Sequence, residues 1–464
     1  MLRPTTIAGY FEASTRLAKV VAAVSVLAFA LLSTKSNTDD AAKVQADAVN
    51  VRETLTRMGA TFIKVGQVLA NRPDIVRADY MNELTKLQDQ VPAFPSNIAF
   101  EIMETGLGKP VSEVFENMTP EPLAAASLGQ VYKATLKKDG REVAIKVQRP
   151  GVAELIKRDI YLLRLIAKGF NEEAVKRIGV DAVTLIDEFA ENLLEELDYT
   201  QEAANIQSFQ SNFYGDPTVK ICDVYPELSS EKVLVMEWID GVRCTDTQKI
   251  LDMGVPVEEF IRVGVDAQTR QILEFGLFHG DPHPGNIFAL HDGRIAYVDF
   301  GSVAEISQFD KETMVDCVIF AMDEDFLGIA GAMSNLGFIM PGTDLVPISL
   351  ALQKMWTDAV GRDMKDFNLR TLTREFSKLV YEYPIRVPER FALVIRTLLT
   401  QEGICLTLDP NFKLLEVAYP CIAKRLLRDP TYSDRLPQVL LKNDPLSSKP
   451  VCASTMIYVC IDHL

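Results

Sequence analysis

The chain has 464 residues, of which 48% are hydrophobic and 24% are charged. This composition is ordinary for a globular protein, and the length allows either two or three domains or one bilobal enzyme with extensions. The formal net charge of -16 argues against a general nucleic-acid-binding protein, because no broad cationic surface would offset the repulsion from phosphates. None of the 7 cysteines forms a C-x-x-C pair, which argues against a zinc site or a disulfide framework and indicates a reducing compartment.

Residues 1–40 form an apolar N-terminal segment, whose centre is the run from Val20 to Leu32 that only Ser25 interrupts. The run is shorter than the ~20 residues that a helix needs to span a bilayer. No small-residue cleavage pattern follows it, and the acidic Glu12 upstream is untypical of a signal or transit peptide. Two interpretations stay open: a membrane-associated or short spanning helix, and a buried core helix.

Residues 41–120 are expected to form a helical extension. Apolar residues recur with a period near 3.6 from Ala41 to Leu87, which predicts helix. The stretch Val91-Pro-Ala-Phe-Pro95 breaks this pattern, and Ser96 after it is typical of a helix N-cap.

Residues 121–240 are expected to form a small mixed lobe with inserted helices. Two strands are predicted on either side of the turn Lys138-Asp-Gly140, which is a hairpin signal. The predicted elements, in chain order, are strands at 129–136 and 141–147, helices over 152–209, and strand-like runs at 219–224 and 232–238.

Residues 241–441 are expected to form a larger helical lobe that contains one non-helical segment, 278–301, with two short strands around His291-Asp-Gly293. Strands that come first and helices that come later indicate an α+β protein. The fold class predicted is therefore α+β, with a small mixed lobe, a larger helical lobe and an N-terminal helical extension.

The strongest functional signal is His279-Gly-Asp-Pro-His-Pro-Gly-Asn286 followed by Val298-Asp-Phe-Gly301. Phosphoryl transfer from ATP needs a carboxylate at the nucleophile and oxygen ligands for Mg²⁺. Asp281 can orient or deprotonate an attacking hydroxyl, Asn286 can offer an amide oxygen to the metal, and Asp299 would be the main Mg²⁺ ligand. These residue types also favour turns, but a turn explains either half of the pattern and not both in this order. His283 is expected to stabilise the loop rather than to bind metal.

Lys146 ends the strand-like sequence Val143-Ala-Ile-Lys146, which matches the strand that carries the phosphate-binding lysine of kinases. A lysine on an apolar strand is costly unless its charge is paired, which favours a functional role.

The position of the glycine-rich loop of kinases holds the sequence Leu123-Ala-Ala-Ala-Ser-Leu-Gly-Gln130. Glycines let a loop approach phosphates closely, and alanines restrict this approach. The nucleotide-binding residues predicted here are Ala124, Ala125, Ala126 and Ser127. The alternative is that the three alanines form a plain helical or packed segment.

These motifs together resemble the UbiB/ADCK (aarF-domain-containing) family of atypical kinases, which has plastid, mitochondrial and bacterial members. The resemblance covers roughly residues 40–440 and is greatest to the plastid and cyanobacterial branch. Its marks are Lys64-Val-Gly-Gln67, the alanine-rich loop, the lysine strand, Glu196-Leu-Asp198, His279-Gly-Asp-Pro-His-Pro-Gly-Asn286 and Asp299-Phe-Gly301. The tail 442–464 does not resemble the usual family ending and has no assigned function.

The resemblance implies roles for further residues. Lys146 would contact the phosphates and pair with Glu202, while Lys64 would lie near Glu196 and Asp198, in a helix that blocks the surface used by protein substrates. The regulatory residues implied are Lys64, Gly66, Gln67, Glu196 and Asp198, and the adenine-binding hinge residues are Met236, Glu237 and Ile239.

The resemblance also implies an atypical kinase or ATPase that binds Mg²⁺ with ATP or ADP and acts in isoprenoid-quinone lipid metabolism. The expected partners are the nucleotide and a membrane lipid or lipid-modifying enzymes, without nucleic acid. The expected location is a plastid membrane or plastoglobule, with a mitochondrial inner membrane or a bacterial membrane as alternatives. Two other functions stay open, a protein kinase acting in trans and a non-catalytic nucleotide-binding scaffold. Against the protein kinase stand the missing glycine-rich loop and the short segment Ser302 to Met314.

Overall fold

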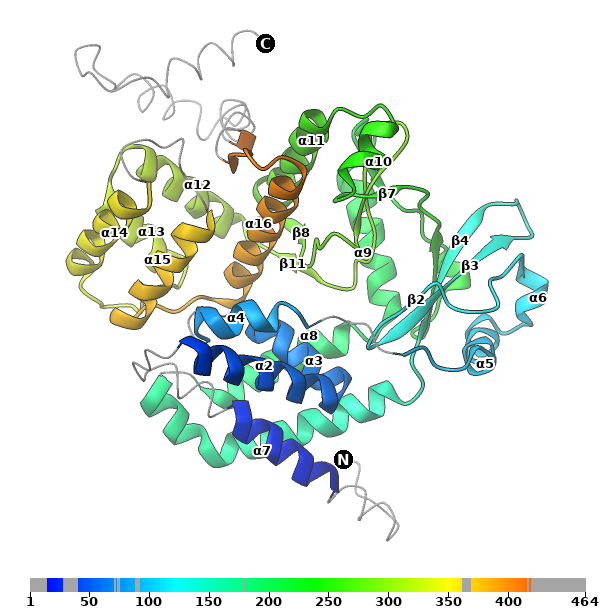
Figure 1. The fold of residues 1–464 in the computed structure, drawn as a ribbon, viewed down its shortest axis with the longest axis horizontal. Coiled ribbons are helices and arrows are strands. Elements are labelled where there is room, and N and C mark those ends of the chain that lie inside the picture. The colour runs from blue at the N-terminus through cyan, green and yellow to red at the C-terminus, as the bar shows by residue number, and fades with distance from the viewer. Residues whose placement is uncertain are drawn as a thin grey trace. The chain divides into compact units, whose positions relative to one another are not determined.

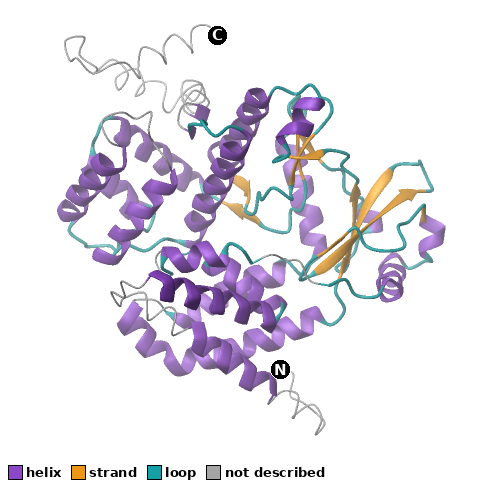
Figure 2. Ribbon diagram, in the orientation of Figure 1, coloured by secondary structure: helices purple, strands orange, loops and turns teal. Residues whose placement is uncertain are grey.

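The structure, a computed structural model, describes residues 15–27, 41–70, 72, 76–87, 92–178, 181–360, 369–414 and 417–418. It is a mixed helix and sheet protein (Figures 1 and 2). The chain divides into two compact units. The first unit runs up to Ser211 and adds Cys222–Ile239 and Asp299–Ser302, and the second holds Asn212–Ile221, Asp240–Val298 and the chain from Val303. The predicted tail 442–464 lies outside the described residues.

In the chain, the helices of the first unit either precede the first strand of its sheet or lie between two later strands. They comprise residues 15–27, α2 (Ala41–Met58), α3 (Ala60–Leu69), α4 (Ala78–Leu84), α5 (Ser96–Leu107), α6 (Val111–Val114), α7 (Val152–Ile178), α8 (Ala182–Glu195) and α9 (Tyr199–Asn212). The helical pattern predicted over 41–87 is confirmed for α2, α3 and α4, with a break at Gly59, whose φ of 93° favours glycine. Between α3 and α4, residues 72, 76 and 77 are not helical, and 71 and 73–75 lie outside the described residues. The prediction of Ser96 as N-cap is wrong: Pro95 precedes α5, and the Ser96 hydroxyl accepts a hydrogen bond from Tyr132 at 3.1 Å instead.

The described part of the apolar N-terminal segment, residues 15–27, is a helix packed into a cluster with α2, α3 and α7. Val20 and Ala23 are buried in this cluster, as are Leu55 and Phe62. The same helix exposes Val21. Burial of one face agrees with the interpretation as a core helix, and the rest of the predicted run, 28–32, lies outside the described residues.

The sheet of the first unit has the order β1-β3-β4-β6, with β2 paired to β3. Its strands are β1 (Phe115–Glu116), β2 (Ala124–Ala125), β3 (Gly129–Leu136), β4 (Glu142–Gln148) and β6 (Val233–Glu237). The predicted hairpin between β3 and β4 is confirmed, and Gly140 in its turn has a φ of 74°. Val143, Ile145 and Val147 are fully buried against α5, so the alternation along β4 turns Lys146 to the opposite face of the sheet.

The second unit contains a four-stranded sheet, a two-stranded sheet and a set of helices. Its strands are β5 (Val219–Ile221), β7 (Val242–Arg243), β8 (Leu277–His279), β9 (Ile287–Ala289), β10 (Ile295–Tyr297) and β11 (Val303–Glu305). The two strands predicted around His291-Asp-Gly293 are confirmed as β9 and β10, which pair antiparallel. β5 pairs in parallel with β10, so the two predicted runs at 219–224 and 232–238 belong to different sheets.

The helices of the second unit are α10 (Thr247–Asp252), α11 (Val257–Arg270), α12 (Gln308–Met322), α13 (Phe326–Asn335), α14 (Leu345–Val360), α15 (Leu369–Glu382) and α16 (Glu389–Leu408), with a π-helical turn at Gln271–Phe275. Among the described residues, α16 alone is long and apolar enough to cross a membrane by length and composition. Half of its apolar stretch is buried, as expected of the core helix that it is here.

Asp216 anchors the turn before β5. Its Oδ1 accepts hydrogen bonds from the Thr218 N–H and hydroxyl, both at 2.7 Å, and Arg270 on α11 pairs with Oδ2. Burial opposes ionisation of this carboxyl, but the bonds from Arg270 and Thr218 outweigh burial, and the pKa of Asp216 lies below its ordinary value.

Replacing Asp216 by Asn is expected to lower the free energy of unfolding by about 2 kcal/mol at pH 7, because the Arg270 guanidinium and the Thr218 donors lose a charged acceptor. A depressed pKa contributes stability above the unfolded-state value of about 4 and loses it as the pH falls through the folded-state value. Urea denaturation of both proteins between pH 3 and pH 7 measures this difference. A difference that stays constant over this range would contradict the assignment.

Candidate nucleotide site

Lys146 lies at the centre of a charged cluster in the first unit. Its ammonium donates to both oxygens of Glu202 at 2.9 and 3.0 Å, and to Asp299 Oδ1 at 3.0 Å. β4 supplies the lysine, α9 supplies the glutamate, and the Asp-Phe-Gly segment supplies the aspartate. The predicted pairing of Lys146 with Glu202 is thus formed, and Glu202 is almost completely buried.

The pKa values of Lys146 and Glu202 are both raised in this cluster, for different physical reasons. Burial opposes the charge of Lys146, but Asp299 and Glu202 outweigh it and hold the pKa of Lys146 well above its ordinary value. Burial raises the pKa of Glu202 to about 7, against the effect of the Lys146 charge. Lys146 therefore stays a cation, held between two carboxyl groups.

Tyr199 lies beside the cluster and carries no signal in the sequence motifs. The Lys146 ammonium lies 5.2 Å from the centre of its ring, within the range of a cation–π interaction. The ring also fixes Gly129 at the start of β3: a Cβ there would lie 2.5 Å from the Tyr199 hydroxyl and 2.6 Å from the Val147 carbonyl oxygen. The glycine therefore allows close packing of β3, β4 and α9 below the lysine.

The Asp299-Phe-Gly301 segment is held by α9. Asp299 has a φ of 61°, a left-handed conformation that is uncommon for a residue other than glycine. Phe300 is fully buried against Phe209 with ring centres 4.8 Å apart, and Asn205 donates to the Phe300 carbonyl oxygen at 3.0 Å. These contacts fix the backbone that presents the Asp299 carboxylate to Lys146.

The Lys64 motif lies on α3. The Lys64 ammonium contacts Glu196 Oε2 at 2.7 Å, and both side chains are partly buried. Gln67 donates to the Leu87 carbonyl oxygen at 3.4 Å, and a Cβ at Gly66 would lie 2.2 Å from Leu87 Cδ1. The motif glycine is therefore a packing requirement of α3.

Asp198, from the same motif as Glu196, contacts the start of α9 rather than Lys64. Its Oδ1 accepts from the Thr200 N–H at 2.9 Å and the Thr200 hydroxyl at 2.6 Å. Both bonds lie at the first turn of α9, whose N-terminal donors need such acceptors.

The alanine-rich segment forms a tight hairpin, so the alternative of a plain helical segment is wrong. Ala124 and Ala125 form β2 on β3, and the Ala126 N–H donates to the Gly129 carbonyl oxygen at 2.8 Å. Ser127 is buried. Arg149 donates to the Ala126 carbonyl oxygen at 3.1 Å and holds the tip of the hairpin. Arg149 lies two residues after the end of the predicted lysine strand, and that position is the only signal by which sequence analysis could have found it.

The predicted hinge residues lie at the end of the segment Cys222–Ile239, after which the chain enters the second unit. Met236 lies buried on β6, and Ile239 is the last residue before the chain enters the second unit. The Glu237 N–H already donates to the Asp223 carbonyl oxygen at 2.7 Å. The backbone atom of Glu237 that could bind adenine is therefore its carbonyl oxygen.

Asp281 and Asn286 lie in the second unit, on the loop between β8 and β9. The Asn286 side-chain amide donates to the Asp281 carbonyl oxygen at 3.2 Å, which leaves its amide oxygen as the atom for a metal. His283 Nδ1 accepts from the Gly285 N–H at 2.9 Å, as expected of a residue that stabilises the loop. Arg396 from α16 forms an ion pair with Asp281.

The residues predicted to bind magnesium fit that ion by their chemistry. A carboxylate from Asp299 and an amide oxygen from Asn286 are hard oxygen ligands, and Mg²⁺ is usually held by one or two carboxylates together with substrate phosphates. Within the described residues, no three His, Cys, Asp or Glu side chains gather as a metal cluster of their own. Asp299 belongs to the first unit and Asn286 to the second.

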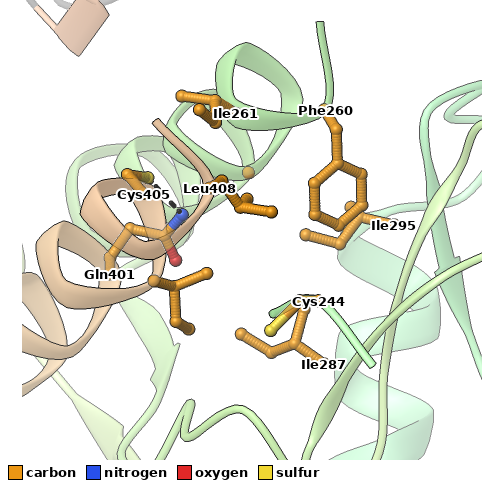
Figure 3. A pocket seen from close by; sticks show the side chains of 10 residues that line it. Cys244, Phe260, Ile261, Ile287, Ile295, Gln401, Cys405 and Leu408 are labelled. Atoms are coloured by element: carbon orange, nitrogen blue, oxygen red, sulfur yellow. Dashed lines mark hydrogen bonds between the residues drawn. The ribbon is translucent and has the colours of Figure 1, made fainter. Parts of the chain in front are cut away.

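A small apolar cavity in the second unit lies apart from these residues. Figure 3 shows it between α11, α16 and the strands, with Cys244 and Cys405 in its wall. Burial raises the pKa of Cys244 and of Cys405 to about 12, so both thiols stay protonated. The cavity contains none of the predicted site residues and is part of the packing around α16.

Comparisons with known proteins agree with this fold. Residues 86–333, more than half of the chain, match the ABC1 atypical kinase-like domain, and residues 352–413 match the UbiB helical domain. A solved structure, Rv3197 from Mycobacterium tuberculosis in complex with erythromycin, shares 25% identity with a TM-score of 0.52, over 84% of this chain and 100% of that one.

Curated relatives share much more of the sequence. The chain is 56% identical over 398 residues to the Arabidopsis thaliana protein ACTIVITY OF BC1 COMPLEX KINASE 1, chloroplastic, across 85% of this chain and 58% of that protein. It thus spans less than two thirds of that relative's length. It is 48% identical over 398 residues to the uncharacterized Synechocystis protein slr1919, across 85% of this chain and 70% of that protein. The chain belongs to the ABC1/UbiB family of atypical kinase-like proteins.

Proposed function

We propose that the protein is an atypical kinase or ATPase that binds Mg²⁺ with ATP or ADP and acts in isoprenoid-quinone lipid metabolism at a membrane. The observation that carries this proposal is the bridge from Lys146 to Glu202 and Asp299, at 2.9 and 3.0 Å. In protein kinases, a lysine paired with a helical glutamate contacts the ATP phosphates, and the aspartate of Asp-Phe-Gly holds Mg²⁺.

The roles proposed for the residues follow from the motifs that contain them. Lys146 would hold the phosphates, while Glu202 keeps the lysine charged and oriented. Asp299 and Asn286 would hold Mg²⁺, which neutralises charge on the transferring phosphoryl group when it is bound. Asp281 would orient the attacking hydroxyl or water.

The Lys64–Glu196 ion pair supports a restricted activity over a protein kinase acting in trans. It ties α3, which the family resemblance places over the protein-substrate surface, to the end of α8 at 2.7 Å. A free protein-kinase surface would require this partly buried pair to separate. Phosphate transfer to an added protein that is lost in Asp281→Asn would favour the protein kinase.

The location proposed is a plastid membrane or plastoglobule, because several of the relatives carry the word chloroplastic in their names. The partners proposed are a nucleotide and a membrane lipid or lipid-modifying enzymes. The acidic net charge of -16 supports the expectation that nucleic acid is no partner.

Magnesium-dependent ATP hydrolysis by the purified protein, with and without anionic liposomes, tests the proposed function. We expect turnover that requires Mg²⁺ and rises with the liposomes. Nucleotide binding by calorimetry without turnover in either condition would refute the enzyme and favour a nucleotide-binding scaffold.

Replacing Ala125 by Gly is expected to change the ratio of the affinities for ATP and ADP. The freedom that glycine adds to a strand residue, about 0.5–1 kcal/mol, corresponds to a change of about two- to fivefold. Competition binding with both nucleotides measures the ratio, and Ala22→Gly on the exposed face of the helix at 15–27 is a remote control. An unchanged ratio would show that this hairpin does not lie over the phosphates.

A further inference from the structure

Arg396 forms an ion pair with the carboxylate predicted to orient the phosphoryl acceptor. Its guanidinium donates from Nη2 to Asp281 Oδ1, and the two residues lie 115 positions apart in the chain. The side chains are 23% and 26% exposed, so the pair is neither fully solvated nor isolated from a substrate. Neither residue type nor spacing in the sequence indicates this contact.

The backbone around Asp281 is fixed by its own loop. The Asp281 N–H donates to His279 Nδ1 at 3.1 Å, and the Asp281 carbonyl oxygen accepts from Asn286 at 3.2 Å. These two bonds leave the side chain free to rotate about its own torsions. In the described part of the chain, the bond from Arg396 is the one that restrains the carboxylate.

Thr397, which follows Arg396 on α16, contacts the first residue of His279-Gly-Asp281. Thr397 is buried and donates its hydroxyl to the His279 carbonyl oxygen at 3.2 Å. Two consecutive residues of α16 therefore contact the first and last residues of His279-Gly-Asp281. Through these two contacts, the position of this part of α16 affects the position of the Asp281 carboxylate.

Arginine is suited to this task because its planar guanidinium presents several N–H donors in a fixed geometry that matches a carboxylate. It occupies Oδ1 of Asp281, and no described residue hydrogen-bonds to Oδ2. The second oxygen can thus face the acceptor. Little proton abstraction is needed in a loose phosphoryl-transfer transition state, so orientation of the acceptor is the larger contribution.

We propose that Arg396 is a positioning residue for Asp281. The proposal rests on the proposed function, since it assigns Arg396 to the same reaction. If it is correct, loss of Arg396 lowers turnover only because the Asp281 carboxylate is no longer oriented.

The test is steady-state Mg²⁺-ATP hydrolysis by the full chain with Arg396→Gln. We expect kcat to fall about 100-fold, the loss that a misplaced reacting group causes, with the KM for ATP unchanged. Arg396→Lys should restore part of kcat, because it returns a cation to Oδ1. The double variant Arg396→Gln with Asp281→Asn should be no slower than Asp281→Asn alone, since the two residues act as a unit.

Arg390→Gln is the matched control on the same helix. Arg390 pairs with buried Asp310 at 3.0 Å, away from the Asp281 loop. Its loss should lower the melting temperature without changing kcat per folded molecule. An Arg396→Gln protein with normal kcat, or losses that add in the double variant, would overturn the proposal. Absence of turnover in the unmodified protein would instead overturn the proposed function and this inference with it.

Discussion

An Asp299→Asn protein is expected to lose Mg²⁺-dependent ATP hydrolysis by about a thousandfold or more, because the substitution removes a charged metal ligand at the transferring phosphate. The fold should persist. Lys146 keeps both bonds to Glu202, at 2.9 and 3.0 Å, so its charge remains paired. The measurement is phosphate release at saturating ATP over a range of Mg²⁺ concentrations.

The matched control for this prediction is Asp292→Asn, which makes the same chemical change. Asp292 lies exposed in the turn between β9 and β10, where it pairs with Arg294 at 2.7 Å. Its loss should leave turnover intact. Equal turnover in the Asp299→Asn protein and the unmodified protein would remove Asp299 from the metal site.

Replacing Arg16 by Gln is expected to lower the free energy of unfolding of the first unit by about 3–5 kcal/mol, because it leaves a buried carboxylate without its cation. Asp159 on α7 is completely buried and accepts from Arg16 Nε at 2.8 Å and from the Thr61 hydroxyl at 2.7 Å. Arg16 also donates to the Met58 carbonyl oxygen at 3.1 Å. One side chain thus joins the helix at 15–27 to α2 and α7.

Arg164→Gln on α7 is the control, since Arg164 pairs with Asp187 at 2.6 Å but both side chains are about 40% exposed. An exposed pair contributes about 0–1 kcal/mol, so this variant should unfold almost like the unmodified protein. Chemical denaturation followed by circular dichroism compares the two. Similar losses in both variants would show that burial of Asp159 does not determine the effect.

Local structure follows closely from the sequence in the β3–β4 hairpin. The alternation of apolar residues, the turn at Lys138-Asp-Gly140 and the strand lengths depend on neighbours a few positions away. The same holds for β9 and β10 around His291-Asp-Gly293. A helix boundary that depends on a single residue is predicted less well. Ser96 has the chemistry of an N-cap, but its hydroxyl accepts a hydrogen bond from Tyr132 instead.

Pairing between distant residues is a different matter. The partner of Lys146 came from a family resemblance, and the tertiary structure brings Glu202 on α9 to the lysine on β4. No motif marks Tyr199 and Arg149, which contact predicted site residues in the first unit, or Arg396, which pairs with Asp281 in the second. Each acts through a contact that depends on packing.

The sequence by itself determined the kinase-like character of this protein, the order of its motifs and the residue types that can hold phosphate and magnesium, because these are local patterns of chemistry. The tertiary structure decided which charges meet. Arg16 reaches Asp159 across 143 positions and Arg396 reaches Asp281 across 115, and no short-range periodicity encodes either contact. It also decided that one face of the apolar helix at 15–27 is buried, since an apolar face is covered only where a complementary surface packs against it.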